Sequence, residues 1–261
     1  MDRDERRTWA ERITTARRNG RTLSPITDEH ALTLADAYAI QDLVTAARVA
    51  DGQAVIGWKL GYTSEVMRAQ MGIDRPNFGP LTDAMVVETG RHVPFPLVQP
   101  RVEPEIAVTI ARTVPGDVVA SEVAGYIDEL RVCLEIVDPV WRDYRFHIED
   151  NTADGSSAAG VVLGPRLDAD LEIDDVRDLP VVLRRDENEV GRGTVRDAMD
   201  GPDRAIAWLS AELGRRGRSL RPGDVVITGG LTAAIPLYRG TRVDAVVDGS
   251  TTVSVRRPDS G

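Results

Sequence analysis

Lysine is nearly absent from this sequence. Lys59 is the only lysine among 32 lysine and arginine residues, and it lies in the apolar stretch from Val55 to Tyr62. An ammonium group can give up its proton when it is removed from water, whereas a guanidinium stays charged. Lys59 is therefore the first catalytic candidate, and its burial predicts a lowered pKa, which neighbouring acids would oppose. The alternative is that an arginine-rich composition left one lysine by chance, with its charged end in solvent.

Cysteine and histidine are also scarce. Cys133 is the only cysteine, so the chain cannot form an internal disulfide. The three histidines, His30, His92 and His147, are far apart and show no metal-ligand spacing. Zinc is bound mainly by these two residue types, so a zinc site is disfavoured. We expect Cys133 to be a small core residue and the histidines to be structural or exposed.

Long apolar runs and an excess of positive charge are missing as well. No run approaches the roughly 20 apolar residues that span a membrane, and the first residues do not lead into a signal peptide. We therefore expect a cytoplasmic protein. The net charge of -10 disfavours nucleic acids and anionic membranes as partners, because both would be repelled. An anionic substrate would need a bound cation to offset this field.

The order of the patterns predicts an α+β protein. Apolar residues recur at helical spacing over residues 8–18 and 33–50, so residues 1–52 are expected to form a helical N-terminal segment. Residues 53–261 are expected to form a β-rich catalytic domain, interrupted by helices at 64–71 and 202–215. The predicted strands are rich in β-branched residues and bounded by Gly, Pro or Asp, and they cover residues 54–62, 102–111, 131–138, 159–163, 180–184, 224–228 and 242–247.

Three glutamates stand inside predicted strands. Glu103 and Glu105 are two residues apart, so on a strand both side chains point to the same face. Glu135 has apolar neighbours on both sides, which indicates a buried strand, where a carboxylate needs a compensating cation. Carboxylate oxygens are the ligands that Mg²⁺ and Mn²⁺ prefer. We interpret the three as a divalent metal site; the alternative for Glu103 and Glu105 is a solvent-facing edge strand, which Pro104 would suit.

Other common catalytic signatures are missing. The sequence has no Gly-x-Ser-x-Gly elbow, phosphate-binding loop or dinucleotide-binding glycine motif after a strand, so it gives no support to a serine hydrolase, a nucleotide hydrolase or a dinucleotide enzyme. Gly229 and Gly230 follow a predicted strand. They indicate either a tight turn or a place where backbone amides approach a ligand.

With these features, the chain resembles the 2-oxo-4-pentenoate hydratase and 4-oxalocrotonate decarboxylase family, within the fumarylacetoacetate hydrolase superfamily. The resemblance covers nearly the whole length. Its motifs are Ala37-Tyr38-Ala39-Ile40-Gln41, Gly57-Trp58-Lys59-Leu60-Gly61, Pro76-Asn77-Phe78-Gly79, Val102-Glu103-Pro104-Glu105, Leu134-Glu135-Ile136-Val137-Asp138, Ala153-Asp154-Gly155-Ser156-Ser157 and Asp224-Val225-Val226-Ile227-Thr228-Gly229-Gly230.

The resemblance implies a fold, a cofactor and a site. The fold would be a mixed β-roll core preceded by a smaller α/β segment. Mg²⁺ or Mn²⁺ would be held by Glu103, Glu105 and Glu135, with Lys59 near the substrate. The substrate, a small anionic 2-oxo acid, would lie at or near Asn77, Asp154, Ser157, Gly230 and Thr232. Family members form homo-oligomers, so we expect one here, and association with a partner enzyme of the same pathway is a further expectation.

The departures from the family favour one reaction over another. Hydratases of this family usually have Pro-Asp-Phe-Gly where this chain has Asn77, and an amide cannot exchange protons as an acid does. The preferred function is therefore a lyase that decarboxylates a 2-oxo-3-hexenedioate (4-oxalocrotonate), with the cation stabilising the enolate that forms. The alternatives are a 2-hydroxypenta-2,4-dienoate hydratase, a biosynthetic lyase or acylpyruvate hydrolase recruited from the family, and a non-catalytic protein that binds a small acid.

Overall fold

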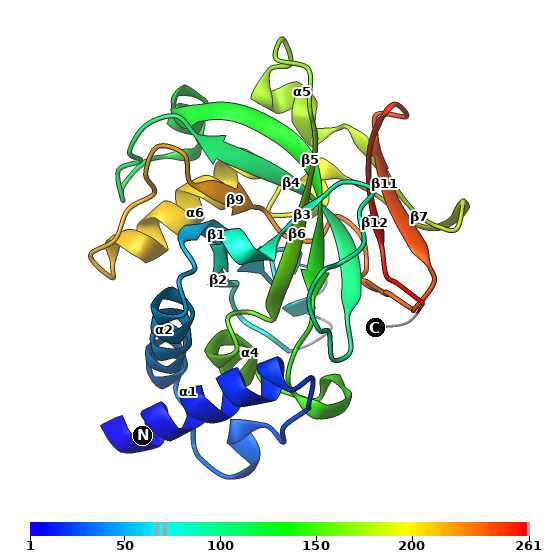
Figure 1. The fold of residues 1–261 in the computed structure, drawn as a ribbon. Coiled ribbons are helices and arrows are strands. Elements are labelled where there is room, and N and C mark those ends of the chain that lie inside the picture. The colour runs from blue at the N-terminus through cyan, green and yellow to red at the C-terminus, as the bar shows by residue number, and fades with distance from the viewer. Residues whose placement is uncertain (66–67, 70–71, 260–261) are drawn as a thin grey trace.

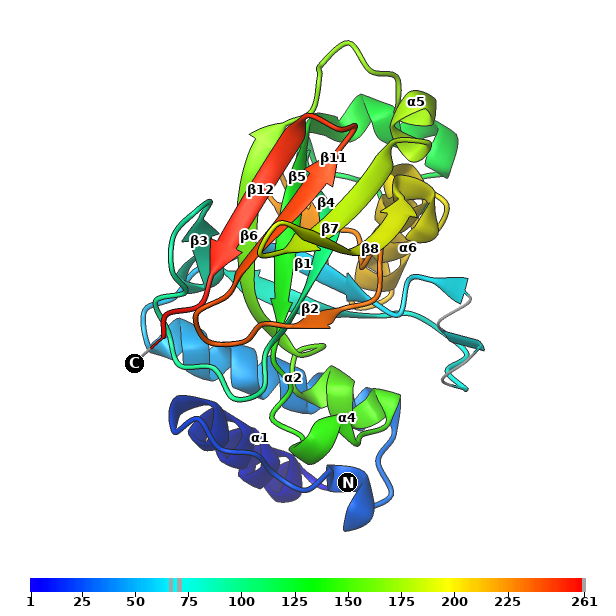
Figure 2. The same ribbon diagram turned by 90° about the vertical axis from the view of Figure 1, so that its right-hand side faces the viewer.

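The computed structural model describes residues 1–65, 68–69 and 72–259. Two sheets form the body of the molecule, and a layer of helices covers one end of it (Figure 1). A quarter turn of the view shows a smaller sheet packed in front of a larger, curved one (Figure 2). This arrangement agrees with the predicted α+β class and its mixed sheet. Among the described residues, the helices are all too short or too polar to cross a membrane.

The larger sheet runs through the middle of the molecule. Its strands are β1 (Val55–Gly61), β2 (Asn77–Thr82), β3 (Val86–Glu88), β4 (Arg101–Ile110), β5 (Ile127–Val137), β6 (Ala158–Arg166), β9 (Val225–Ile227) and β10 (Ile235–Pro236). In the described part of the chain their order is β2-β1-β9-β4-β5-β6-β3, with β10 paired to β4. The β1–β9 and β3–β6 pairs are parallel, whereas β4 and β5 form a long antiparallel pair at the centre. The sheet is therefore mixed.

The smaller sheet consists of consecutive antiparallel pairs. Its strands are β7 (Pro180–Arg185), β8 (Asn188–Thr194), β11 (Arg242–Val247) and β12 (Thr251–Arg256), and they lie in the order β12-β11-β7-β8. β12 also packs against β5 and β6 of the larger sheet. This contact closes the two sheets around the main hydrophobic core.

Side-chain caps mark the starts of the two long N-terminal helices. The helices are α1 (Arg3–Arg18), α2 (Leu34–Ala50), α4 (Ile148–Ala153), α5 (Ile173–Arg177) and α6 (Pro202–Gly214), with short 3₁₀ helices η1 (Ile26–Asp28), η2 (Asp83–Met85), η3 (Ala120–Tyr126), η4 (Arg142–Tyr144) and η5 (Val195–Asp197). Asp2 accepts hydrogen bonds from the backbone N–H groups of Asp4 and Glu5, so α1 starts earlier than the predicted residue 8. Thr33 caps α2 in the same way.

The N-terminal helices pack on a core of their own. Trp9, Ile13 and Ile40 are buried there together with Trp141 and Ala153 from the later part of the chain. The first helices are thus joined to the α4 region by apolar contacts. The predicted division of the chain after residue 52 stays a prediction.

The strand alternation of β4 and β5 separates two buried faces of the larger sheet. Val102, Ile106 and Val108 on β4, with Leu134 on β5, belong to the main core shared with the smaller sheet and α6. The residues between them point to the opposite face. That face holds a smaller apolar cluster of Leu81, Met85, Ala107, Cys133, Ala158, Val161 and Ile227, and Cys133 is fully buried in it, as expected of a core thiol.

The seven predicted strands are confirmed as β1, β4, β5, β6, β7, β9 and β11, with shifts at their ends. The sequence patterns missed β2, β3, β8, β10 and β12. β2 contains Gly79 and Pro80, which are typical of turns, yet all of its residues are buried. Its stability comes from pairing with β1 and not from local propensity. The predicted helix at 64–71 includes positions 66–67 and 70–71, which lie outside the described residues.

Candidate metal centre and substrate cavity

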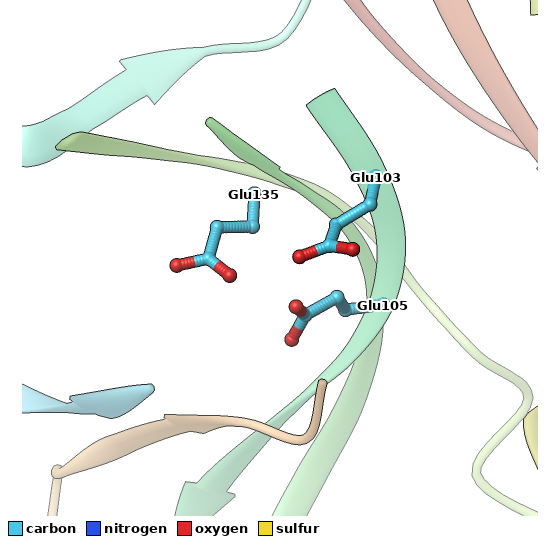
Figure 3. Close-up of side chains that lie close together, drawn as sticks. All are labelled: Glu103, Glu105 and Glu135. Carbon is cyan, nitrogen blue, oxygen red and sulfur yellow. The ribbon is translucent and has the colours of Figure 1, made fainter. Parts of the chain in front are cut away.

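Glu103, Glu105 and Glu135 point into one space from two adjacent strands (Figure 3). Glu103 and Glu105 share a face of β4 because they are two residues apart. In the register of the β4–β5 pair, Glu103 lies directly opposite Glu135. Side chains that are opposite in an antiparallel pair lie on the same face, so the register adds the third carboxylate to the other two.

The carboxylates are close together and poorly satisfied by the protein. One oxygen from each lies within 4.8 Å of the others. Glu105 and Glu135 are 0% exposed, and Glu105 Oε1 and Glu135 Oε1 have no hydrogen-bond donor among the described residues. Burying a carboxylate without a partner is costly. Three hard oxygen donors with free lone pairs fit Mg²⁺ or Mn²⁺, so the residues present suit the expected cation.

The electrostatics of the cluster follow from this crowding. Burial, together with the charge of Glu135, raises the pKa of Glu103 to about 7. The pKa of Glu105 is raised well above its usual range by burial and by both other glutamates. Three negative charges cannot coexist cheaply at this spacing, so in the absence of a cation the cluster retains protons.

Lys59 completes the cluster from the neighbouring part of the sheet. Its Nζ lies 3.0 Å from Glu135 Oε2 and donates a hydrogen bond of 2.9 Å to the carbonyl oxygen of Ser156. Burial acts to lower the pKa of Lys59, but the charges of Glu135, Glu105 and Glu103 outweigh it, and the net pKa is raised. The lowered pKa expected from burial is therefore not found, because the three carboxylates hold the ammonium charged.

Gly229 and Gly230 bring backbone close to the carboxylates. The Gly229 N–H donates a 2.7 Å hydrogen bond to Glu105 Oε2, and its φ of 102° is one that only glycine adopts readily. A Cβ on Gly230 would clash with Glu103 Oε2. The sequence left open whether these glycines form a tight turn or let the backbone approach a ligand. The structure shows a close approach of the backbone to the candidate metal ligands.

A cavity of about 270 Å³ opens beside the cluster. The residues that line it include Lys59, Tyr62, Arg101, Glu103, Tyr144, Phe146, Asn151, Ser156, Ser157, Gly230 and Thr232. Its volume is close to the lower end of the range for small-molecule sites. Both charged and aromatic groups are available to a ligand there.

The predicted substrate residues fall into two groups. Ser157, Gly230 and Thr232 line the cavity together with Lys59 and Glu103. Asn77 and Asp154 do not line it, and both are fully buried.

Asn77 and Asp154 are engaged by the protein. The Nδ2 group of Asn77 donates to Asn151 Oδ1 and Thr152 Oγ1, both at 2.9 Å. The Oδ1 atom of Asn77 accepts from Ser156 Oγ at 2.9 Å. Asp154 pairs with Arg17 Nη2 at 2.5 Å and accepts from the backbone N–H of Val140. The polar atoms of both side chains are therefore engaged by the protein, and neither residue lines the cavity.

The sequence patterns missed several cavity residues. Arg101 stands two residues before Glu103 on β4 and so shares its face. Its guanidinium lies over the Tyr144 ring, 4.2 Å from the ring centre, and among the described residues it has no carboxylate partner and no hydrogen-bond acceptor. The alternation that identified Glu103 and Glu105 could have identified Arg101. Tyr62, by contrast, comes from a loop with a positive φ of 56°, which no sequence pattern signals.

Comparison with known proteins places the chain in a family. A family model described as "Fumarylacetoacetate (FAA) hydrolase C-terminal" matches residues 54–256. A 2-hydroxyhexa-2,4-dienoate hydratase of Comamonas testosteroni is 33% identical over 254 residues, which are 95% of this chain and 96% of that protein. A 4-oxalocrotonate decarboxylase of a Pseudomonas species is 32% identical over 235 residues, which are 90% of this chain and 91% of that protein.

A solved structure extends the similarity to the whole fold. The 4-oxalocrotonate decarboxylase of Pseudomonas putida G7, in complex with magnesium and adipate, superposes with a TM-score of 0.92 and 28% identity over 98% of both chains. The expected β-roll fold and the resemblance read from the motifs are thereby confirmed. Together with the curled mixed sheet and the match of residues 54–256, these similarities show that the chain belongs to the fumarylacetoacetate hydrolase family.

Proposed function

We propose that this protein is a divalent-metal-dependent lyase that decarboxylates a short, unsaturated 2-oxo dicarboxylic acid of the 2-oxo-3-hexenedioate type. The observation that carries the proposal is the charge distribution of the cavity. Glu103 and Lys59 line it, with Glu105 and Glu135 next to them. Arg101, a guanidinium without a carboxylate partner among the described residues, lines the same cavity.

The spacing of Arg101 and Glu103 suits a ligand with two carboxylates. The two residues are separated by two positions on β4, so their Cα atoms are about 7 Å apart. This is comparable with the span between the carboxylates of an extended six-carbon chain. The P. putida decarboxylase is described in complex with adipate, which is a six-carbon dicarboxylate. We infer that Arg101 binds the far carboxylate while the 2-oxo acid end lies at the glutamates.

The chemistry at the glutamate end needs an electron sink. A bound Mg²⁺ or Mn²⁺ supplies positive charge beside the 2-oxo group. In 2-oxo-3-hexenedioate the far carboxylate is vinylogous to a β-keto acid. Its C–C bond breaks to release CO₂, and the electron pair moves through the alkene to the 2-oxo oxygen. One proton added at that oxygen gives 2-hydroxypenta-2,4-dienoate, so atoms and charge balance.

The chain's own residues orient the substrate and supply the proton donor. Lys59 Nζ is held by Glu135 and by the Ser156 carbonyl, which fixes it at the wall of the cavity. It is the ammonium donor beside the 2-oxo end. Tyr144 fixes the plane of the Arg101 guanidinium, and the Tyr144 hydroxyl donates to the Gln99 carbonyl at 2.9 Å, which holds the ring in place.

Asn77 argues against water addition. The hydratases of this family usually carry an aspartic acid there, whereas this side chain is an amide with its two polar atoms already hydrogen-bonded inside the protein. An amide cannot hold and release a proton in the addition of water.

Hydration of 2-hydroxypenta-2,4-dienoate is the second candidate function. The names of several relatives favour it, among them the C. testosteroni hydratase and a 2-keto-4-pentenoate hydratase of Dechloromonas aromatica that is 34% identical over 244 residues. Identity alone does not separate the two reactions, because the decarboxylase relatives are 30–32% identical.

The test is a paired assay of the purified protein with Mg²⁺ and with a chelator. 2-Oxo-3-hexenedioate and 2-hydroxypenta-2,4-dienoate are followed separately by ultraviolet absorbance and product mass. The expected result is metal-dependent release of CO₂ from the first and no water addition to the second. Hydration of the second without decarboxylation of the first would overturn the proposal in favour of the hydratase.

A further inference from the structure

A second cavity lies between the helical layer and the sheet, away from the glutamates. Its volume is about 340 Å³, within the range of small-molecule sites. α1 and α2 form one side of it, and the segments around Met85, Phe95 and Ala159 form the other. None of the residues that line the catalytic cavity lines this one.

Arg48 brings to this cavity a positive charge that has no ion-pair partner among the described residues. Its only side-chain hydrogen bond among them is a 3.7 Å contact from Nη1 to the sulfur of Met85. No carboxylate of the described chain forms an ion pair with it. Burial, together with the charge of Arg17, lowers the pKa of Arg48 to about 10. The other N–H donors of this half-buried guanidinium have no acceptor among the described residues, so they are available to a ligand.

Arg17 is largely engaged by the protein. Its Nη2 pairs with Asp154 and its Nη1 donates to the carbonyl oxygen of Asp138, while its Nε is buried, with no acceptor among the described residues. Both arginines line the same cavity. The other two charged residues that line the cavity, Arg18 and Asp51, form an ion pair with each other, so their charges cancel. With Arg17 neutralised by Asp154, the cavity carries about one net positive charge, that of Arg48.

Most of the rest of the wall is apolar, and Thr14 and Gln53 are its other polar residues. The apolar part is formed by Ile13, Val44, Ala84, Met85, Phe95, Pro96 and Ala159. A ligand that fits this wall has a hydrophobic body, and its charged end must match a single positive charge. Guanidinium groups bind carboxylates through paired N–H donors. An oxyanion carried on an apolar body therefore fits better than a free inorganic anion.

We propose that this cavity binds a small monocarboxylate with an aromatic or aliphatic body, whose carboxylate accepts from the Arg48 guanidinium. The ligand would be distinct from the substrate, which lies at the glutamates.

The second cavity is connected to the catalytic one through a short loop. Arg17 holds Asp154, which is followed by Gly155, Ser156 and Ser157, all three with positive φ. The Ser156 carbonyl in turn accepts from Lys59 Nζ. A carboxylate that draws Arg17 away from Asp154 would shift the anchor of Lys59. The bound monocarboxylate is therefore expected to change turnover as well as to bind.

The experiment is calorimetric titration of the Mg²⁺-loaded full-length protein with benzoate and hexanoate, and with acetate and phosphate for comparison. We expect benzoate and hexanoate to bind at least about tenfold more tightly than acetate or phosphate, because only they fill the apolar wall. Arg48→Gln should weaken their binding by about tenfold or more, and Arg48→Lys should weaken it less.

Variants at the other cavity separate the two sites. Arg101→Gln should leave benzoate binding unchanged, since Arg101 lines only the catalytic cavity. The melting temperature of each variant checks that it is folded. Unchanged benzoate binding in a folded Arg48→Gln variant would overturn the proposal, as would binding that Arg101→Gln abolishes. A cavity that is covered by a second copy of the chain would show no benzoate binding at millimolar concentration, together with a dimer in sedimentation analysis, and this too would overturn it.

Discussion

Glu103 and Glu135 are direct partners across the β4–β5 pair, so two carboxylates face each other where a cross-strand pair usually joins opposite charges or apolar groups. Like charges at this position destabilise a sheet unless a cation lies between them. Glu105 and Lys59 extend the same cluster. The long antiparallel pair that carries the centre of the sheet is therefore also the element on which the candidate metal centre depends.

Replacing Glu103 by glutamine should abolish metal-dependent turnover. The variant keeps the shape of the side chain but loses one anionic ligand, so we expect Mg²⁺ affinity to fall on the order of 100-fold or more. Calorimetric titration of Mg²⁺ and the decarboxylation rate would measure this. Glu122→Gln, at an exposed glutamate in η3, is the matched control and should behave as the wild type. Wild-type metal-supported activity in Glu103→Gln would contradict the assignment of the ligands.

Lys59→Arg tests what the single lysine contributes. The guanidinium keeps the positive charge but is larger, and it does not exchange protons at neutral pH. We expect kcat to fall by about 100-fold or more. The rate under saturating substrate and Mg²⁺ measures the effect. An unchanged kcat would mean that Lys59 serves only as a fixed positive charge.

Arg101→Gln should weaken the binding of the dicarboxylate substrate. Loss of one charged hydrogen-bond partner is expected to raise the Michaelis constant for the dicarboxylate substrate roughly tenfold or more, with a much smaller change in kcat. Steady-state kinetics with 2-oxo-3-hexenedioate measures both constants. The control is Arg112→Gln, which removes another guanidinium that lies over a tyrosine ring, 4.4 Å from the centre of Tyr126, outside the cavity. Equal Michaelis constants in the Arg101→Gln and Arg112→Gln variants would show that Arg101 does not bind the substrate.

Asn77→Asp should destabilise the protein and should not create a hydratase. The new carboxylate cannot donate to Asn151 and Thr152, and it would be buried as a charge. We expect a loss of roughly 2–4 kcal/mol in the free energy of unfolding. Urea unfolding measures it, with the exposed Asn188→Asp as control. Efficient hydration of 2-hydroxypenta-2,4-dienoate by the variant would instead show that residue 77 alone selects the reaction.

The low pKa of Asp36 predicts how the stability of the helical layer changes in acid. Hydrogen bonds from Thr33, with those from Arg6, lower the pKa of Asp36 from its usual value to about 2 despite its burial. A carboxylate with a depressed pKa contributes stability above its unfolded pKa and loses it as the pH falls toward the folded one. Asp36→Asn should therefore cost about 2 kcal/mol at neutral pH, and this cost should shrink between pH 4 and pH 2. Urea unfolding of both proteins at several pH values checks the trend, which a pH-independent difference would contradict.

Strand alternation made the metal cluster predictable from sequence. The spacing of Glu103 and Glu105 alone places both side chains on one face of a strand, and the apolar neighbours of Glu135 indicate burial. The pairing of Glu103 with Glu135 needed the register of two strands, which are separated by a long connection that no local pattern determines.

The direction of the pKa shift of Lys59 could not be predicted from the sequence either. It depends on the sum of burial and three nearby charges, and the sequence contained the residues but not their distances. Asn77 and Asp154 stand in motifs of the family, yet their hydrogen bonds point into the protein. The packing of α4 against β2 reveals this for Asn77, and the contact with Arg17 of α1 reveals it for Asp154.

The position of Lys59 in β1 has a consequence for proteolysis. A protease that cuts only after lysine has a single target in this chain, the Lys59–Leu60 bond. Both residues are almost fully buried, and their strand is paired on both sides, with β2 and with β9. Such a bond can be cut only when the strand leaves the sheet. Cleavage into two fragments would therefore record the opening of the catalytic sheet itself, and a ligand that holds this sheet together would be seen directly as slower cleavage.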